Sequence, residues 1–174
     1  MTLINEILTC QKCVLAQRGS PIKPLWFSKT PEYVLVFETP KQEEAFVGEP
    51  ISILEKIFLE KSIDLKKVYI TNLVKCPARN KKLAQRTITQ QDIDACVDWL
   101  KQEVEHLKPK KIIGFGQKIH EFIVGKQYNR VTDLYSVHQF LGYEYHAFPN
   151  LKYSLGRSKK ELVKLISNIR KEVT

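Results

Sequence analysis

The chain has 174 residues, 28 of them Lys or Arg and 19 of them Asp or Glu, which gives a formal net charge of +9 at pH 7. This length fits one domain with a sizeable core, and no apolar run approaches the roughly 20 residues of a membrane-spanning helix. We therefore expect one cytoplasmic, monomeric domain over residues 1–174, with no membrane partner. The charge excess favours nucleic acid as a partner through counterion release, although solvated surface lysines would give the same composition.

Short apolar runs alternate with segments of helical spacing. Runs rich in β-branched and aromatic residues predict buried strands over residues 33–37, 68–71, 111–115 and 143–148. Helical spacing predicts helices over residues 51–61, 90–107 and 117–124, and a capping box at 158–161 opens a last helix. Because strands alternate with helices, we expect an α/β fold, a three-layer sandwich around a central four-stranded parallel sheet.

Polar side chains follow three of the predicted strands. Ligands bind beyond the carboxyl ends of the strands in a parallel sheet, and Glu38, Asn72 and Asn150 lie there. Each of them is able to hold a base or position a water molecule. The ordinary alternatives stay open, because a Glu after a strand is often solvated or caps a helix, and an Asn there often makes a turn.

Four cysteines form a close pair, Cys10 and Cys13, and two distant single positions, Cys76 and Cys96. Such thiolates converge only if the fold brings them together, and a metal centre is the usual reason. Buried structural cysteines are one alternative, and disulfides are another, although the first residues lack the pattern of a secretion signal. Zinc usually takes two close pairs or a Cys/His mixture, whereas the long gap between Cys76 and Cys96 holds no histidine. We therefore favour an iron–sulfur cluster over zinc.

Basic residues gather in two segments, one directly after Cys76 and one before the last predicted helix. We expect both segments to contact nucleic-acid phosphates, unless they are simply solvated surface. The residues concerned are Arg79, Lys81, Lys82, Arg86, Arg157 and Lys159.

Several motifs together resemble the iron–sulfur uracil-DNA glycosylases (family 4). They are the cysteine layout, Ala45-Phe-Val-Gly48, Tyr69-Ile-Thr-Asn-Leu-Val-Lys-Cys76, Cys96-Val-Asp-Trp-Leu100 and Lys110-Lys-Ile-Ile-Gly-Phe-Gly116. The resemblance runs from about Cys10 to the last helix. It implies a uracil-DNA glycosylase-like fold, a 4Fe–4S cluster on the four cysteines, and DNA containing uracil or another deaminated base as the partner. The implied reaction is hydrolysis of the N-glycosidic bond of that base.

The resemblance also implies roles for individual residues in a site that receives a flipped base. Phe46 would stack on the base, and Asn72 would hydrogen-bond its polar edge. Glu38 would position water, and Thr39, beside it in the same motif, would contact the substrate. Phe148 and Asn150 stand in the second motif, Phe148 as a substrate contact and Asn150 as a candidate catalytic group.

The two site motifs depart from the family pattern. The first is typically Gly-Glu-Ala-Pro-Gly, but residues 37–41 read Phe-Glu-Thr-Pro-Lys, so both glycines are replaced by bulk. The second is typically His-Pro and a small residue, but residues 148–150 read Phe-Pro-Asn, so the histidine is absent. His146 lies two residues upstream, on the same face of the predicted strand. A catalytically weak or inactive iron–sulfur DNA-binding relative therefore remains the alternative function.

Overall fold

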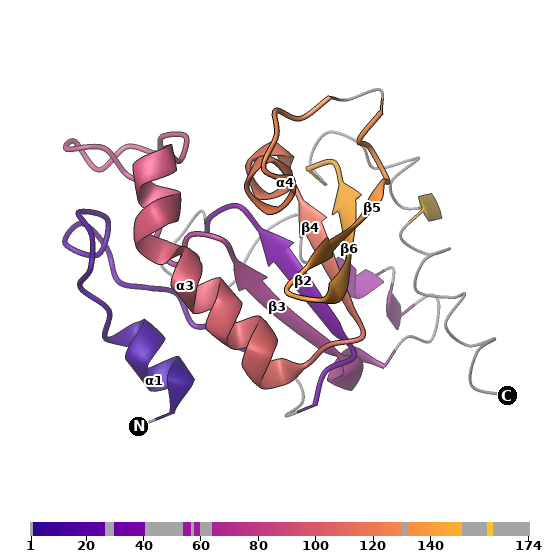
Figure 1. Cartoon of the computed structure of the whole chain (residues 1–174). Coiled ribbons are helices and arrows are strands. Elements are labelled where there is room, and N and C mark those ends of the chain that lie inside the picture. The colour runs from indigo at the N-terminus through magenta and orange to yellow at the C-terminus, as the bar shows by residue number, and fades with distance from the viewer. Residues whose placement is uncertain are drawn as a thin grey trace, which may run out of the picture.

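The structure, a computed structural model, describes residues 2–26, 30–40, 54–56, 58–59, 64–129, 132–150 and 160–161. Its centre is a parallel sheet of four strands, which follow one another in space in the order β3-β2-β4-β6 (Figure 1). The strands are β2 (Tyr33–Phe37), β3 (Val68–Asn72), β4 (Lys111–Phe115) and β6 (Tyr143–Phe148). The predicted four-stranded parallel sheet is therefore confirmed.

Two further strands extend this sheet at its edges. β1 (Leu25–Trp26) pairs antiparallel with β3, and β5 (Val137–Phe140) pairs antiparallel with β6, so the described sheet has six strands. The sequence analysis missed both strands. β1 has only two residues, and β5 shows no run of apolar residues because it lies half exposed at the edge.

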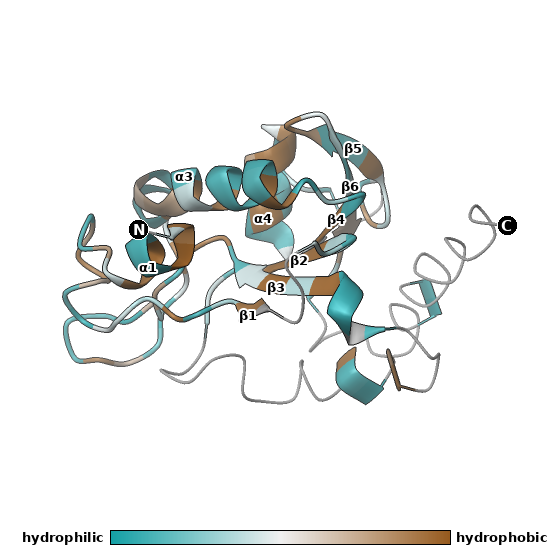
Figure 2. Cartoon of the chain, turned by 90° about the horizontal axis from the view of Figure 1, so that it is seen from below, coloured by the Kyte–Doolittle hydropathy of each residue, from teal (hydrophilic) through white to brown (hydrophobic). Residues whose placement is uncertain are grey.

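Side chains of the central strands alternate between two apolar layers. Val34 and Val36 pack with α3 (Gln90–Leu107) and α4 (Gln117–Val124), whereas Leu35 packs on the opposite face with Leu54 and Phe58. Figure 2 shows α1 (Leu3–Leu8), α3 and α4 together on one side of the sheet. A short 3-10 helix, η1 (Leu65–Lys67), leads into β3. This arrangement confirms the three-layer architecture.

The bounds of α3 and α4 agree with the predicted helices. At the start of α3, the Asp92 backbone N–H donates to the Thr89 side chain, and the Asp92 carboxylate accepts the Thr89 backbone N–H. At its end, Lys108 adopts a left-handed conformation before Pro109. α1 was not predicted. Of the predicted helix at 51–61, positions 54–56 and 58–59 are described and helical, whereas the last helix lies outside the described residues except for 160–161.

None of the helices within the described ranges is both long enough and apolar enough to cross a membrane.

Candidate four-thiol centre and strand-end site

The carboxyl ends of the four parallel strands form one continuous row. Strand register pairs Asn72 with Phe37, Phe37 with Phe115, and Phe115 with Phe148. The Phe37 and Phe115 rings stack with centroids 4.9 Å apart, and the Phe148 ring tilts against Phe115 at 5.7 Å. The row therefore consists of one amide beside three aromatic rings, at the edge where ligands bind in parallel sheets.

Asn72 is the polar member of this row, and only 2% of its surface is exposed. Its side-chain oxygen Oδ1 is buried and has no hydrogen-bond partner among the described residues. Leaving a buried acceptor unpaired costs about 1–3 kcal/mol, so such an atom is usually matched by a ligand, a water molecule or a partner group. The buried amide is thus placed to accept a hydrogen bond from a ligand.

Glu38 follows β2 and packs against the start of α4. Its Oε1 atom accepts the backbone N–H of Lys118 at 2.9 Å. Gly116 makes room for this side chain, because a Cβ atom at Gly116 would lie 2.5 Å from the same Oε1. Burial raises the pKa of Glu38, and the Lys118 N–H and charge oppose that shift. The carboxylate therefore caps α4 and also lies at the strand-end edge.

The other predicted residues of this edge have varied environments. The Thr39 hydroxyl donates to the backbone carbonyl of Cys76 at 2.9 Å, which ties the end of β2 to the loop after β3. Asn150 is exposed beyond the end of β6. Phe46 lies outside the described residues, so its stacking role stays a prediction.

Phe148 occupies the position at which the resembled family carries a histidine. It is 5% exposed, and its ring meets Tyr135 edge-on at 5.2 Å in addition to Phe115. His146 does not replace the missing group at the strand end, because its Nε2 hydrogen-bonds Glu144 further back along β6. Burial lowers the pKa of His146, and Glu144 opposes that shift. The β6 end is therefore apolar.

The four cysteines converge from three segments: the loop after α1, the loop after β3, and α3. All four are free thiols. Burial raises the pKa of Cys76 to about 12, and repulsion from the other three thiols adds to the shift. Burial likewise raises the pKa of Cys96 to about 11, with Cys13 and Cys10 contributing. Cys76 and Cys96 belong to one buried cluster, and Cys10 and Cys13 pack against it. The four positions therefore lie in one region of the fold, and their binding of a common metal centre stays a prediction.

Two N–H groups point at the sulfur atoms of this four-thiol centre. The Lys75 backbone N–H donates to Cys96 Sγ at 3.2 Å, and the Trp99 indole N–H donates to Cys10 Sγ at 3.3 Å. Within the described ranges, no three His, Cys, Asp or Glu side chains are placed to hold a single metal ion. A 4Fe–4S cluster makes a different demand, since each thiolate binds a separate iron atom. Four free, converging thiols with N–H donors fit such a cluster better than a mononuclear zinc site.

A buried ion pair joins this centre to Asn72. Lys75 and Glu103 are 2% and 1% exposed, and their Nζ and Oε2 atoms lie 2.5 Å apart. Lys75 Nζ also donates to the Asn72 carbonyl at 2.6 Å and to Thr71 Oγ1 at 2.8 Å. The Tyr69 hydroxyl donates to Glu103 Oε1 at 2.6 Å. All these groups are therefore held in one network behind the end of β3.

The sequence analysis missed this network, although Lys75 and Glu103 each stand out in the sequence. Lys75 interrupts the apolar run after β3, and Glu103 stands on the helical stripe that includes Leu100, Val104 and Leu107. A charge on an apolar stripe is rarely buried unless it is paired. The sequence could thus have predicted two buried charges, but their separation of 28 positions hides the pairing.

The predicted basic contacts divide into different environments. Lys81 and Lys82 are exposed, and Arg79 is half-buried. Arg86 instead makes a two-pronged ion pair with Asp92, with N···O distances of 2.6 and 2.8 Å. Asp92 therefore neutralises much of the Arg86 charge within the protein. Arg157 and Lys159 lie outside the described residues.

Comparison with known proteins agrees with this geometry. Residues 26–168 match the family model of the uracil DNA glycosylase superfamily. Curated relatives named type-4 uracil-DNA glycosylase come from Archaeoglobus fulgidus, at 32% identity over 70% of this chain, and Thermotoga maritima, at 33% over 71%. Another, from Sulfurisphaera tokodaii, is 27% identical over 74% of this chain. The matches cover 61%, 66% and 60% of those relatives, respectively, so the chain spans about three fifths of the first and the third.

Proposed function

Because the chain belongs to the uracil-DNA glycosylase superfamily, we propose that it removes uracil, or a related deaminated base, from DNA by hydrolysing the N-glycosidic bond. The curated relatives share the name type-4 uracil-DNA glycosylase, which favours an active enzyme over an inactive DNA-binding relative. The proposal covers residues 1–174 as one monomeric domain with DNA as its partner.

The observation that carries the proposal is the unpaired, buried Oδ1 of Asn72 at the strand-end edge. Uracil presents a ring N–H between two carbonyl oxygens. The Asn72 amide can accept from that N–H and donate to a neighbouring carbonyl, which reads the polar edge of the base. Extruding a base from the duplex costs a few kcal/mol, and stacking and hydrogen bonding in the pocket offset that cost. Asn72 thus supplies both recognition and a donor for the leaving base.

The chemistry separates an anionic base from a cationic sugar. An enzyme accelerates this step by placing donors where the negative charge develops and by positioning a water molecule near the sugar carbon. We assign the first task to the Asn72 amide and pocket N–H groups, and the second to Glu38. Because Phe148 offers no hydrogen-bond donor, we expect this protein to release the base more slowly than a variant with a donor at position 148.

We further propose that Cys10, Cys13, Cys76 and Cys96 hold a 4Fe–4S cluster. When bound, the cluster would supply a rigid cross-link between distant segments. We assign it no redox role, because hydrolysis of a glycosidic bond transfers no electrons. Lys75 N–H and Trp99 Nε1–H would hydrogen-bond the coordinated sulfur atoms. The Thr39 bond to the Cys76 carbonyl then joins the cluster loop to the strand-end site.

The direct test is an excision assay with protein purified without oxygen. Single- and double-stranded oligonucleotides that contain uracil, hypoxanthine or xanthine are incubated with the protein and cleaved at abasic sites with alkali. We expect release of at least one of these bases. Binding to DNA without release from any of these substrates would contradict the proposed activity and would favour the inactive relative.

A further inference from the structure

A buried histidine of α4 has a polar ring that the fold does not satisfy. His120 lies in the middle of α4 and is 1% exposed. Neither of its ring nitrogens makes a hydrogen bond within the described ranges, and the buried Tyr145 hydroxyl makes none there either. An imidazole has a donor and an acceptor to satisfy, and leaving such groups unpaired costs free energy. None of the steps assigned to Asn72 and Glu38 uses this side chain.

Titratable and charged groups surround the His120 ring from α4 itself, the loop after it, β5 and β6. Asp133 Oδ2 lies 3.7 Å from His120 Nε2, which is too long for a hydrogen bond but close enough for an ion pair with a protonated imidazole. The neighbouring rings are Tyr128, His138 and Tyr145, with centroids 5.1, 5.2 and 6.1 Å away, and the other charged groups are Glu121 and Lys126.

Asp133 already has other partners. It is 3% exposed, and its carboxylate accepts the Asn129 backbone N–H at 2.8 Å and the Lys126 ammonium at 2.9 Å. These bonds lower the pKa of Asp133 to about 2, so the carboxylate stays charged in mild acid. A proton on His120 would compete with Lys126 for this carboxylate. Protonation of the imidazole would therefore change the bonds around Asp133.

His120 is neutral at pH 7. Burial lowers its pKa, and His138 and Lys126 add to that shift, whereas Asp133 and Glu121 oppose it. A histidine with a lowered pKa in the folded protein binds a proton more readily in the unfolded chain. The stability contributed by neutral His120 is therefore complete above about pH 6.5, the ordinary value for histidine, and is lost as the pH falls below it.

The α4 side of this cluster is tied to the strand-end site. The His120 backbone N–H donates to the Gly116 carbonyl at 3.5 Å, and the Gly116 N–H donates to the Phe148 carbonyl at 3.0 Å. Between them, the Lys118 N–H donates to Glu38 Oε1. A movement of His120 would therefore be felt in the first turn of α4, which holds the Glu38 carboxylate.

The Asp133 side of the cluster leads to the same site. The Ser136 hydroxyl donates to the Asp133 carbonyl at 2.6 Å. The Tyr135 N–H donates to the Ala147 carbonyl, and the Ala147 N–H donates to the Ser136 carbonyl, so two residues face one in a β-bulge. Tyr135 is left-handed in this bulge, with a φ of +61°, and its ring packs edge-on against Phe148. The turn that Asp133 organises thus places Tyr135 against the strand-end row.

We propose that His120 is a positioning residue whose protonation draws Asp133 away from Lys126 and so loosens the strand-end site in acid. The first turn of α4, which Glu38 caps, and the turn that carries Tyr135 would both shift. This inference rests on the proposed excision activity and adds a proton-dependent control of the same site. The physical cause is a buried charge whose counter-charge is already shared.

The first test follows the proton and requires no excision. The imidazole signals of His120, assigned by comparison with His120→Phe, are recorded by NMR from about pH 8 to about pH 5 in protein purified without oxygen. We expect His120 to titrate below the ordinary histidine value, and Asp133→Asn to lower its midpoint further because an attracting charge is lost. The backbone amides of Lys118 and Tyr135 should shift with the same midpoint. Titration of His120 without any shift of those two amides would overturn the coupling.

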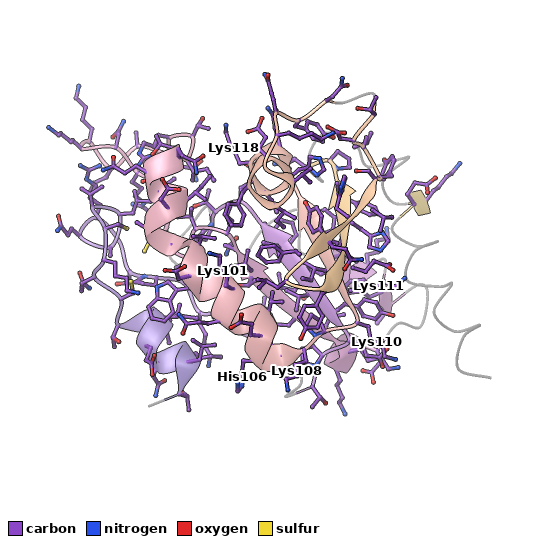
Figure 3. The ribbon with its side chains drawn as sticks, in the orientation of Figure 1. Lys101, His106, Lys108, Lys110, Lys111 and Lys118 are labelled. Carbon is purple, nitrogen blue, oxygen red and sulfur yellow. The ribbon has the colours of Figure 1, made fainter. Side chains whose placement is uncertain are left out.

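The second test compares pH profiles of uracil excision. His120→Phe keeps a ring beside Tyr128 and Tyr145 but stays neutral, and His120→Gln also carries no titratable group. Between about pH 7 and about pH 5, wild-type excision should fall by at least about ten-fold more than excision by either variant. His106→Gln is the matched control, because Figure 3 shows His106 near the carboxyl end of α3, away from Lys118 at the start of α4. It should keep the wild-type profile.

The two tests separate this inference from the proposed function. Protein that shows the coupled titration but releases no base would support the proton-dependent movement and contradict the glycosylase proposal. Protein that releases base with the same acid dependence in wild type, His120→Phe and His120→Gln would overturn the positioning role and support the glycosylase.

Discussion

The two halves of the strand-end edge differ in their chemistry. On the β3 side, Asn72 stands in front of a buried network of charged and hydroxyl groups and next to the four-thiol centre. On the β4–β6 side, Phe115 and Phe148 fill the edge with rings, and Tyr135 packs behind them. The first half is built from directional bonds and the second from apolar packing.

This difference concerns the donors that each half offers to a bound base. The β3 half retains the motif residues of the resembled family, including the cysteines and Asn72, whereas the β6 half has lost the donor that the family pattern places there. Directional polar contacts hold the backbone of Asn72 through its carbonyl, whereas aromatic packing fixes only the shape of a surface. We therefore expect this protein to hold a cluster and read a base edge more effectively than it stabilises the leaving base.

The largest effect should follow from breaking the four-thiol centre. Cys76→Ala or Cys96→Ala removes one cluster ligand, so iron and sulfide should fall from about four each per chain toward zero, with loss of the brown colour and of much of the solubility. Chemical analysis of anaerobically purified protein measures this. Thr39→Val is the matched control, because it removes only the hydroxyl bonded to the Cys76 carbonyl. Stoichiometric zinc without iron in the wild-type protein would contradict the prediction.

The next effect concerns the buried ion pair behind Asn72. Glu103→Gln leaves the Lys75 charge buried without a counter-charge, so the free energy of unfolding should fall by about 3–5 kcal/mol in a urea titration. Glu105→Gln, on the exposed face of the same helix, should change it by less than about 0.5 kcal/mol. The double variant Lys75→Met with Glu103→Leu should recover most of the loss, since it removes both charges. Equal stability of the two single variants would show that the pair is not a major contributor.

Asn72 itself tests whether the β3 half reads the base. Asn72→Ala should lower single-turnover excision by about ten-fold or more, with a smaller change in DNA affinity, because the amide acts mainly on the leaving base. Glu38→Gln should lower excision similarly, while its amide oxygen still accepts the Lys118 N–H and caps α4. An equal loss of binding and excision in either variant would assign that residue to general DNA binding instead.

The β6 half can be tested by adding the donor that it lacks. Phe148→His places an imidazole at the end of the row, so uracil excision should rise by roughly a hundred-fold, near the lower limit for general acid or donor catalysis. Loss of ring packing against Phe115 and Tyr135 should lower stability at the same time. Phe148→Leu is the control, because it loses the ring without gaining a donor and should not raise the rate. No gain with His would mean that packing already closes this half to the base.

The sequence predicted those parts of the molecule that depend on local pattern. The four parallel strands follow from runs of apolar β-formers, and α3 and α4 follow from helical spacing with clear ends. The rule that ligands bind at strand ends brought Glu38 and Asn72 to one edge. β1 and β5 were not predicted, because an edge strand needs little apolar surface.

The rest of the site depends on contacts that form only when the loop after β3 folds. Arg86 was predicted to bind phosphate because it lies in a basic segment. The capping of α3 instead brings Asp92 within hydrogen-bonding distance of it. Thr39 has the position of a substrate contact, but the loop after β3 brings the Cys76 carbonyl to its hydroxyl. Neither partner can be identified from spacing, because both pairings arise only when the loop after β3 is in place.

The smallest effect concerns the exposed lysines beside the β3 half. Lys81→Ala with Lys82→Ala should flatten the dependence of duplex affinity on salt by about one to two units of slope, because each phosphate contact contributes about 0.9. Arg86 is left unchanged, since its ion pair with Asp92 would mix stability with binding.

The control for this variant removes the same two charges at the opposite end of the domain. Figure 3 shows Lys108 and Lys110 beyond the carboxyl end of α3, away from Lys118 at the start of α4. Lys108→Asn introduces a residue that tolerates the left-handed φ of +48° at this position. Lys110→Ala removes one of the two lysines that pair with Glu32, and Lys67 keeps its ion pair. This pair lowers the net charge equally but should leave the salt slope nearly unchanged. If both pairs flatten the slope equally, DNA is attracted by the overall charge, and Lys81 and Lys82 do not form a specific contact surface.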